Sequence, residues 1–229
     1  MRKIDKQQDP KAGRPPLPQL PADVPDIVRT LDAVRAEAAE CQACPLWKNA
    51  TQTVFGEGPA RAAVMLVGEQ PGDQEDLAGR PFVGAAGQML DRALADAGID
   101  RGEVYVTNAV KHFKHEPRGK RRIHKKPSDL EIEACHPWLE HELELVQPAL
   151  VVALGASAAR ALLGHATPIE RNRGRLLPLL GGARLLVTVH PSYLLRVPDQ
   201  YRPEAYRHFV EDLKLALPFL GGTTDLDRL

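Results

Sequence analysis

Four short apolar runs, separated by segments with helical periodicity, constrain the fold of this chain more than any other feature. The runs cover residues 63–67, 104–107, 150–154 and 184–189. Predominantly apolar stretches of this length are typical of parallel strands that are buried on both faces. Helical patterns occur over residues 26–40, 85–97, 157–163 and 203–217, and another begins with a capping-box pattern at Ser128. This alternation predicts an α/β protein: a three-layer α/β/α sandwich around a central four-stranded parallel sheet.

One domain of this kind accounts for most of the 229 residues, and we place it at residues 26–220. Residues 1–25 carry six prolines and little to bury, so we predict a disordered arm there, with a C-terminal tail at residues 221–229. The chain shows no signal peptide and no apolar run long enough for a membrane, and its three cysteines do not suggest a disulfide framework. We therefore expect a cytoplasmic monomer that has no contact with a membrane.

Three polar segments follow predicted strands, at residues 69–73, 108–127 and 190–196. The carboxyl ends of parallel strands meet at one edge of a sheet, where α/β proteins bind their ligands. These segments should therefore converge on one composite site.

The segment from Lys111 to Lys126 is a concentrated cationic patch, with eight Lys and Arg residues against the single acid Glu116. In a protein of zero net charge, such a patch favours contacts with phosphates, although a solvated charge run is the alternative. His124 lies inside this patch. Neighbouring cations should lower its pKa and keep the imidazole neutral and nucleophilic, whereas an exposed or phosphate-binding histidine is the plainer interpretation.

Cys41 and Cys44 form a C-x-x-C pair, a spacing that lets two thiolates bind one metal ion or cluster. A redox pair is the alternative, but no thioredoxin-like βαβ unit surrounds these residues. Cys135 is a third ligand or a small buried side chain. The candidates for a fourth ligand are His112, His115 and His136.

Several of these residues together resemble the iron–sulfur uracil-DNA glycosylases. The matching segments are residues 68–72 (GEQPG), 79–84 (GRPFVG), 107–108 (TN), 190–192 (HPS) and 194–196 (LLR), and the resemblance runs from about residue 41 to 217. Two features point to the UdgX branch of that superfamily, which becomes covalently attached to uracil-containing DNA through a histidine. One is Gln70, where family-4 enzymes usually have Ala, and the other is the basic loop that contains His124.

The resemblance implies a role for each residue of the pocket. Phe82 should stack on a flipped uracil, Asn108 should bond its pairing edge, and His190 should contact O2 and stabilise the departing base. Glu69 should lie near the sugar and orient His124. The remaining substrate-binding positions, mainly through their backbones, are Gln70, Gly72 and Asp73.

The resemblance also implies a DNA-binding surface. Leu194 and Leu195 should fill the gap that the extruded base leaves in the stack. The expected contacts to the backbone of the DNA are Lys120, Arg121, Arg122, Lys125, Ser192 and Arg196. The partner is uracil-containing DNA, either single-stranded or duplex with a flipped uracil, and free uracil is the product.

The implied cofactor is a structural [4Fe–4S] cluster. Family-4 enzymes have a further cysteine just after the segment that matches residues 108–111, and this chain has His112 there. The ligand set would be Cys41, Cys44, His112 and Cys135, which suits zinc equally well on spacing alone.

The activity that follows is a single-turnover DNA glycosylase. The enzyme would break the bond between uracil N1 and sugar C1′, and His124 would capture the resulting oxocarbenium ion. The first alternative is a conventional uracil-DNA glycosylase of family-4 type, in which water captures the ion. The second is a non-catalytic iron–sulfur protein that binds nucleic acid or senses redox state; it gives no reason for Glu69, Asn108 and His190 to converge.

Overall fold

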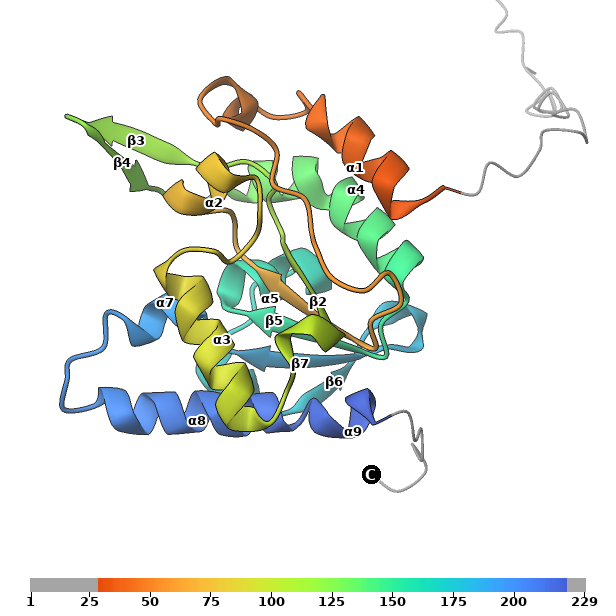
Figure 1. Ribbon diagram of the computed structural model, residues 1–229, viewed down its shortest axis with the longest axis vertical. Coiled ribbons are helices and arrows are strands. Elements are labelled where there is room, and N and C mark those ends of the chain that lie inside the picture. Colours follow the sequence, from red (N-terminus) through yellow and green to blue (C-terminus); the bar gives the residue numbers. More distant parts are fainter. Residues whose placement is uncertain (1–28, 222–229) are drawn as a thin grey trace, which may run out of the picture.

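The computed structural model describes residues 29–221. The predicted arm at residues 1–25, and the predicted tail apart from residue 221, lie outside these residues. Within them, a five-stranded sheet runs in the order β2-β1-β5-β7-β6 (Figure 1). Its strands are β1 (Val64–Gly68), β2 (Val104–Asn108), β5 (Leu150–Leu154), β6 (Leu176–Pro178) and β7 (Arg184–Thr188).

Four of these strands are parallel and match the four predicted runs, but the predicted strand number was wrong. The additional strand, β6, pairs antiparallel with the edge of β7, with Leu176 opposite Leu186. Three residues are too few to show a periodicity, so only the pairing with β7 makes this segment a strand.

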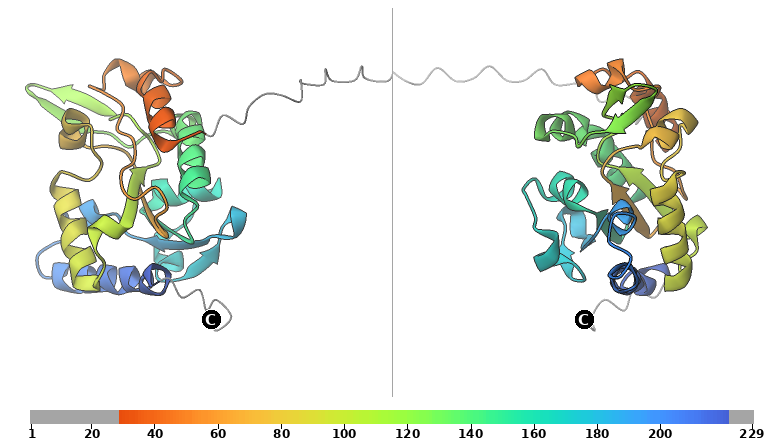
Figure 2. Two further views of the ribbon diagram at one scale, coloured as in Figure 1. Left: turned by 45° about the vertical axis from the view of Figure 1, so that its right-hand side comes forward. Right: turned by 90° about the vertical axis from the view of Figure 1, so that its left-hand side faces the viewer.

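Helices cover both faces of the sheet, which confirms the predicted α/β/α sandwich. On one face, Val64 and Leu66 pack with residues of α3 (Ala85–Ala97) and α8 (Arg202–Lys214). The alternate residues Met65 and Val67 pack on the other face with residues of α4 (Asp129–Val146) and α5 (Ala156–Leu163). The right-hand view of Figure 2 shows the sheet between the green α4 and the yellow α3. Successive side chains of a strand point to opposite faces, so one apolar run supplies both cores.

The remaining helices have between four and nine residues. They are α1 (Leu31–Ala39), α2 (Asp73–Ala78), α6 (Ile169–Asn172), α7 (Pro191–Leu194) and α9 (Leu217–Leu220). The predicted capping box at Ser128 does begin α4, and Gly98, with φ of 81°, ends α3 as expected from its left-handed conformation. Among residues 29–221, no helix combines the length and apolar character needed to span a membrane.

The basic segment predicted as a loop contains a two-stranded hairpin. Its strands are β3 (His115–Arg118) and β4 (Arg121–His124), and Gly119 supplies the turn with a φ of 61°. Charged residues on both strands leave no apolar alternation to identify them from sequence. The hairpin projects beyond the sheet in Figure 1 and places His124 at its base.

Candidate active site

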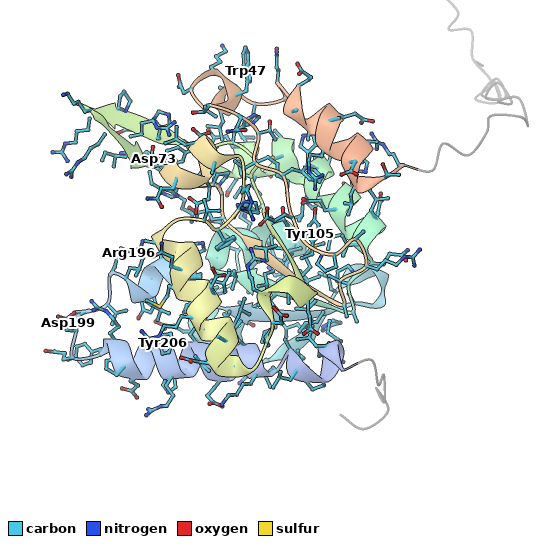
Figure 3. All side chains as sticks on the ribbon, in the orientation of Figure 1. Trp47, Asp73, Tyr105, Arg196, Asp199 and Tyr206 are labelled. Carbon is cyan, nitrogen blue, oxygen red and sulfur yellow. The ribbon has the colours of Figure 1, made fainter. Side chains whose placement is uncertain are left out.

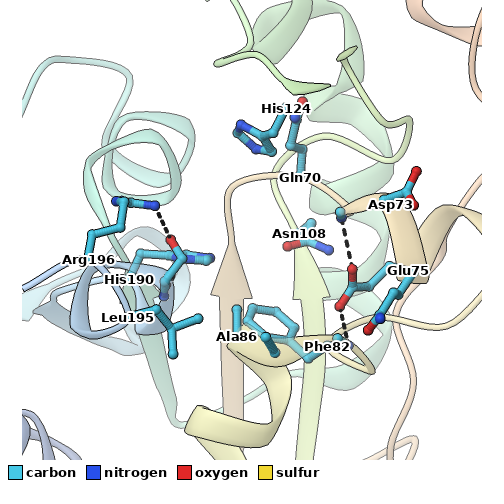
Figure 4. Close-up of a pocket in the computed structure, with 15 residues that line it drawn as sticks. Gln70, Asp73, Glu75, Phe82, Ala86, Asn108, His124, His190, Leu195 and Arg196 are labelled. Carbon is cyan, nitrogen blue, oxygen red and sulfur yellow. Dashed lines mark hydrogen bonds between the residues drawn. The ribbon is translucent and has the colours of Figure 1, made fainter. Parts of the chain in front are cut away.

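The three predicted polar segments meet around a cavity of about 470 Å³ at the carboxyl ends of the parallel strands (Figure 4). The predicted catalytic and substrate-binding residues all line it, except Glu69, which lies beside it. The lining consists of Gln70, Gly72, Asp73, Gln74, Glu75, Phe82, Gly84, Ala85, Ala86, Asn108, His124, His190, Ser192, Leu195 and Arg196.

Asn108 forms the polar floor of this cavity at the end of β2. Its side chain is buried, and its Oδ1 atom has no hydrogen-bond partner within the part of the chain that the structure describes. A Cβ atom at Gly68 would lie 2.3 Å from this oxygen and 2.6 Å from Phe82 Cζ. Glycine at the end of β1 therefore lets Asn108 and Phe82 lie together. A buried acceptor without a partner is costly, so this oxygen is suited to a donor on a ligand.

Phe82 forms the apolar wall and has an unusual backbone. Its φ is 56°, a left-handed conformation that bulky residues rarely adopt. Gly87 makes this possible, because a Cβ atom there would lie 1.8 Å from the Phe82 carbonyl oxygen. The Phe82 ring lies 5.9 Å from that of His190, between centroids. Strain of this kind often accompanies functional sites.

Glu75, which the sequence analysis did not single out, holds two parts of the cavity wall together. Its carboxylate accepts hydrogen bonds from the backbone N–H groups of Gly72 (3.1 Å) and Gly84 (2.7 Å), as Figure 4 shows. The signal was present in the sequence: Glu75 occupies the third position after the glycine that begins α2, as in a capping box.

His190 is a neutral hydrogen-bond donor. Its Nδ1 atom accepts from the backbone N–H of Ser192 at 3.2 Å and lies 2.8 Å from the Ser192 hydroxyl. The hydrogen of the neutral ring must therefore be on Nε2. Removal from water lowers the pKa of His190 to about 4, and the positive charges of His124 and Arg196 add to the effect. Ser192, predicted as a DNA contact, thus fixes the tautomer of His190.

His124 stands at the rim, with 49% of its side chain exposed, and its Nε2 atom lies 3.4 Å from Glu69 Oε1. Its pKa is lowered, as predicted, but for a different reason. Partial burial is the main cause, and the Arg196 guanidinium adds to it, while Glu69 acts in the opposite direction. The cations of the hairpin itself, which we expected to lower this pKa, are not among the causes; Arg122 and Lys125 are paired with carboxylates instead.

Two predicted ligand contacts instead anchor the hairpin. The side-chain amide of Gln70 donates to the carbonyls of Lys114 (3.2 Å) and Lys125 (3.0 Å), so it bonds the base of the hairpin. Arg122 pairs with Asp73 and with the buried Asp76 of α2, at 2.5 Å each. Arg122 and Asp73 therefore satisfy each other in this structure.

The other predicted DNA contacts divide into exposed and buried residues. Lys120 and Arg121 are exposed near the hairpin turn and have no ion-pair partner among residues 29–221, while Lys125 pairs with Glu116 at 2.8 Å. Leu195 is 42% exposed and lines the cavity. Leu194, the last residue of α7 and also predicted to fill the DNA stack, is fully buried and packs into the core in this structure.

Asp73 and Arg196 are labelled in Figure 3 on the side where the hairpin projects, while Tyr105 lies in the interior. The cavity thus opens on the face that carries the hairpin.

The three cysteines lie in one region between the end of α1 and α4. The pKa of Cys135 is raised to about 12, mainly by burial, with smaller contributions from Cys44 and Cys41 and an opposing one from Lys111. The Trp138 indole N–H donates to Cys41 Sγ at 3.1 Å, and the Lys111 backbone N–H donates to Cys135 Sγ at 3.2 Å.

The predicted fourth ligand has a partner of its own, because His112 Nε2 lies 2.9 Å from the Thr53 hydroxyl. Within residues 29–221, no three His, Cys, Asp or Glu side chains are gathered closely enough to ligate a metal.

The fold and this cavity define an α/β protein with a binding site at the carboxyl ends of its parallel strands. Comparison with known sequences identifies its family. Residues 55–214 match the family described as "Uracil DNA glycosylase superfamily", and the chain belongs to that superfamily.

Within it, the chain is similar to the type-4 uracil-DNA glycosylase of Thermotoga maritima, with 38% identity over 83% of this chain and 94% of the relative. The type-4 uracil-DNA glycosylase of Pyrobaculum aerophilum is also 38% identical, over 81% of this chain and 90% of its own. A type-5 uracil-DNA glycosylase of Thermus thermophilus is 34% identical, over 76% of this chain and 80% of its own.

Proposed function

We propose that this protein excises uracil from DNA and is joined to the resulting sugar through His124, as in the UdgX branch of the superfamily. The observation that carries this proposal is the position of His124. A largely neutral imidazole stands at the rim of the cavity, 3.4 Å from a carboxylate, on a hairpin that Gln70 and Arg122 hold in place.

Recognition of uracil rests on Asn108. Its unpartnered Oδ1 accepts from the imide N3–H of uracil, and its amide N–H donates to O4. Cytosine has an acceptor at N3 and a donor at N4, the reverse of the pattern in uracil. Each mismatched pairing is therefore penalised by about 1–3 kcal/mol. Phe82 stacks on the base, and the backbone around Gln70 to Gly72 completes the pocket.

Excision breaks the bond between uracil N1 and sugar C1′, and the bonding electrons leave with uracil. The Nε2–H of neutral His190 donates to O2, where negative charge develops. Because the base must leave the stack to reach this cavity, Leu195 at its rim is suited to fill the vacated space.

Capture follows at C1′. A lone pair of the His124 imidazole forms a bond to the oxocarbenium carbon, and the resulting imidazolium gives its N–H proton to water or to the departed uracil anion. Glu69 stabilises the positive charge as it develops and orients the ring. Lys120, Arg121, Lys125 and Arg196 bind the flanking phosphates, and Ser192 assists through His190 and Arg196.

The Cys41, Cys44, Cys135 and His112 set is proposed to hold a [4Fe–4S] cluster. The three thiols interact with one another, and the sulfur atoms of Cys41 and Cys135 each accept an N–H hydrogen bond. Hydrogen bonds of this kind stabilise thiolate ligands, so the set suits a cluster. The cluster would supply a structural link between α1, α4 and the hairpin. Purified protein should contain iron and sulfide, whereas stoichiometric zinc in protein prepared without oxygen would contradict the cluster, although the same four ligands could hold zinc.

Similarity to type-4 enzymes favours a second candidate, a glycosylase that releases its product and turns over. The two are separated by incubating the protein with a uracil-containing oligonucleotide, boiling in SDS and examining its mobility. Covalent capture gives a slower band that His124→Ser abolishes. Catalytic release of uracil without such a band would establish the turnover enzyme, and borohydride dependence would indicate a lysine Schiff base instead.

A further inference from the structure

The turn after β5 leads into α5, whose first turn brings a hydroxyl to the candidate site. Because β5 lies between β1 and β7 in the sheet, its following loop lies between the loops that carry Glu69 and His190. Gly155 in this loop has a φ of 93°, and a Cβ atom there would lie 3.1 Å from His190 Cβ. Ser157, two residues later, contacts Glu69.

This contact is a charge-assisted hydrogen bond. The hydroxyl of Ser157, whose residue is 3% exposed, donates to Glu69 Oε2 at 2.5 Å. The other oxygen of the same carboxylate, Oε1, is the one that lies 3.4 Å from His124 Nε2. Bonds of this kind between a hydroxyl and a carboxylate are short and about twice as strong as neutral ones.

We propose that Ser157 is a positioning residue for Glu69, an inference that rests on the proposed function. A glutamate side chain has several rotatable bonds, and a carboxylate free to rotate would spend little time facing His124. By holding Oε2, Ser157 fixes Oε1 toward the imidazole and toward the place where charge develops on the sugar. Small displacements of such groups have large effects on rate.

A purely structural role for Ser157 makes a different prediction. The hydrogen bond would then only give the buried Ser157 hydroxyl a partner at the start of α5. Loss of the hydroxyl would lower the free energy of unfolding, and its effect on the rate would not depend on whether Glu69 is present. The two roles are separated by measuring chemistry and binding independently.

The first measurement compares single-turnover uracil release by the wild type and Ser157→Ala. We expect release to be about tenfold slower, in line with the loss of one hydrogen bond to a charged group. The affinity for an oligonucleotide containing 2′-fluoro-2′-deoxyuridine, whose fluorine slows formation of the oxocarbenium ion, should be unchanged. Ser157→Thr retains the hydroxyl and should restore the rate, while Ser157→Cys preserves packing with a weak donor and should not.

A matched control is Thr167→Val, which removes another buried hydroxyl, bonded to the carbonyl of His165 and belonging to a residue that does not line the cavity. This variant should release uracil at the wild-type rate. Thermal unfolding of each variant identifies any loss that comes from instability.

The second measurement is a double-mutant cycle with Glu69→Ala. If Ser157 acts through Glu69, then Ser157→Ala should have little further effect once the carboxylate is absent. A wild-type rate in Ser157→Ala, or an equal loss with and without Glu69, would overturn the inference and leave the proposed function intact. A wild type that neither releases uracil nor becomes joined to the DNA would instead refute the proposed function.

Discussion

The side-chain amide of Gln70 donates a hydrogen bond of 3.0 Å to the carbonyl oxygen of Lys125, the residue that follows His124. Gln70 lies two residues after the end of β1, and Lys125 directly follows the second strand of the hairpin. This bond therefore connects the edge of the sheet to the candidate nucleophile. A second bond to the carbonyl of Lys114 holds the opposite side of the hairpin base. The position of His124 thus depends on hydrogen bonds that Gln70 makes to the backbone on both sides of the hairpin base.

Gln70→Ala should therefore reduce covalent capture more than it reduces uracil excision. Each lost hydrogen bond contributes about 0.5–1.5 kcal/mol, so capture should slow by roughly tenfold as the hairpin loosens. Quantifying both the slow-migrating band and the released uracil measures the two steps. Gln88→Ala, on an exposed position of α3, is the control. A parallel loss of excision and capture would show that Gln70 does not act through the hairpin.

Asn108→Ala should weaken discrimination between uracil and cytosine. The unpartnered Oδ1 and its amide are complementary to uracil and mismatched with cytosine, at about 1–3 kcal/mol for each wrong pairing. Excision rates from matched oligonucleotides with uracil or cytosine at one position give the ratio directly. Unchanged selectivity in a folded variant would mean that Asn108 does not read the base.

The rate of capture should fall in acid, because only neutral His124 is a nucleophile. The pKa of His124 is below its ordinary value of 6.5, so the rate should remain constant from pH 7 downward until the pH approaches the lowered pKa. Below that point the imidazole gains a proton and the rate declines. His190, with a pKa of about 4, should still be neutral when this decline begins.

Arg196→Gln tests the cause of this shift. Removal of the guanidinium charge should raise the pKa of His124 and move the decline to higher pH. Arg121→Gln is the matched control, since this hairpin cation should leave the midpoint where it is. Profiles are measured at saturating DNA. A midpoint that follows Arg121 rather than Arg196 would restore the hairpin cations as the cause.

Replacement of Leu194 by Ala should lower stability, whereas replacement of Leu195 by Ala should lower activity on duplex DNA. Leu194 is fully buried, so its variant should lose about 2–5 kcal/mol of unfolding free energy. Leu195 is 42% exposed, so its variant should keep its stability and lose activity on duplex relative to single-stranded DNA. Denaturant unfolding and paired activity measurements test both. If Leu195→Ala has the same ratio of duplex to single-stranded activity as the wild type, Leu195 does not fill the gap in the stack.

The sequence by itself determined the α/β architecture and the place of the cavity. Short, predominantly apolar runs require burial on both faces, and the polar residues after β1, β2 and β7 must then meet at one edge. Asn108, Phe82 and His190 were accessible to this reasoning because each lies in or near a segment that follows a strand or resembles a known motif.

Only the tertiary structure decided which of the polar groups face one another. The partners of Gln70, Arg122 and Ser157 are distant in sequence, and no local pattern encodes a contact with a carbonyl or carboxylate on another loop. The burial of Leu194 and the exposure of Leu195 depend on how α7 packs against α3, because a four-residue helix has too few turns to show an apolar face. Likewise, the lowered pKa of His124 comes from burial and from Arg196, an arrangement that exists only when the chain is folded.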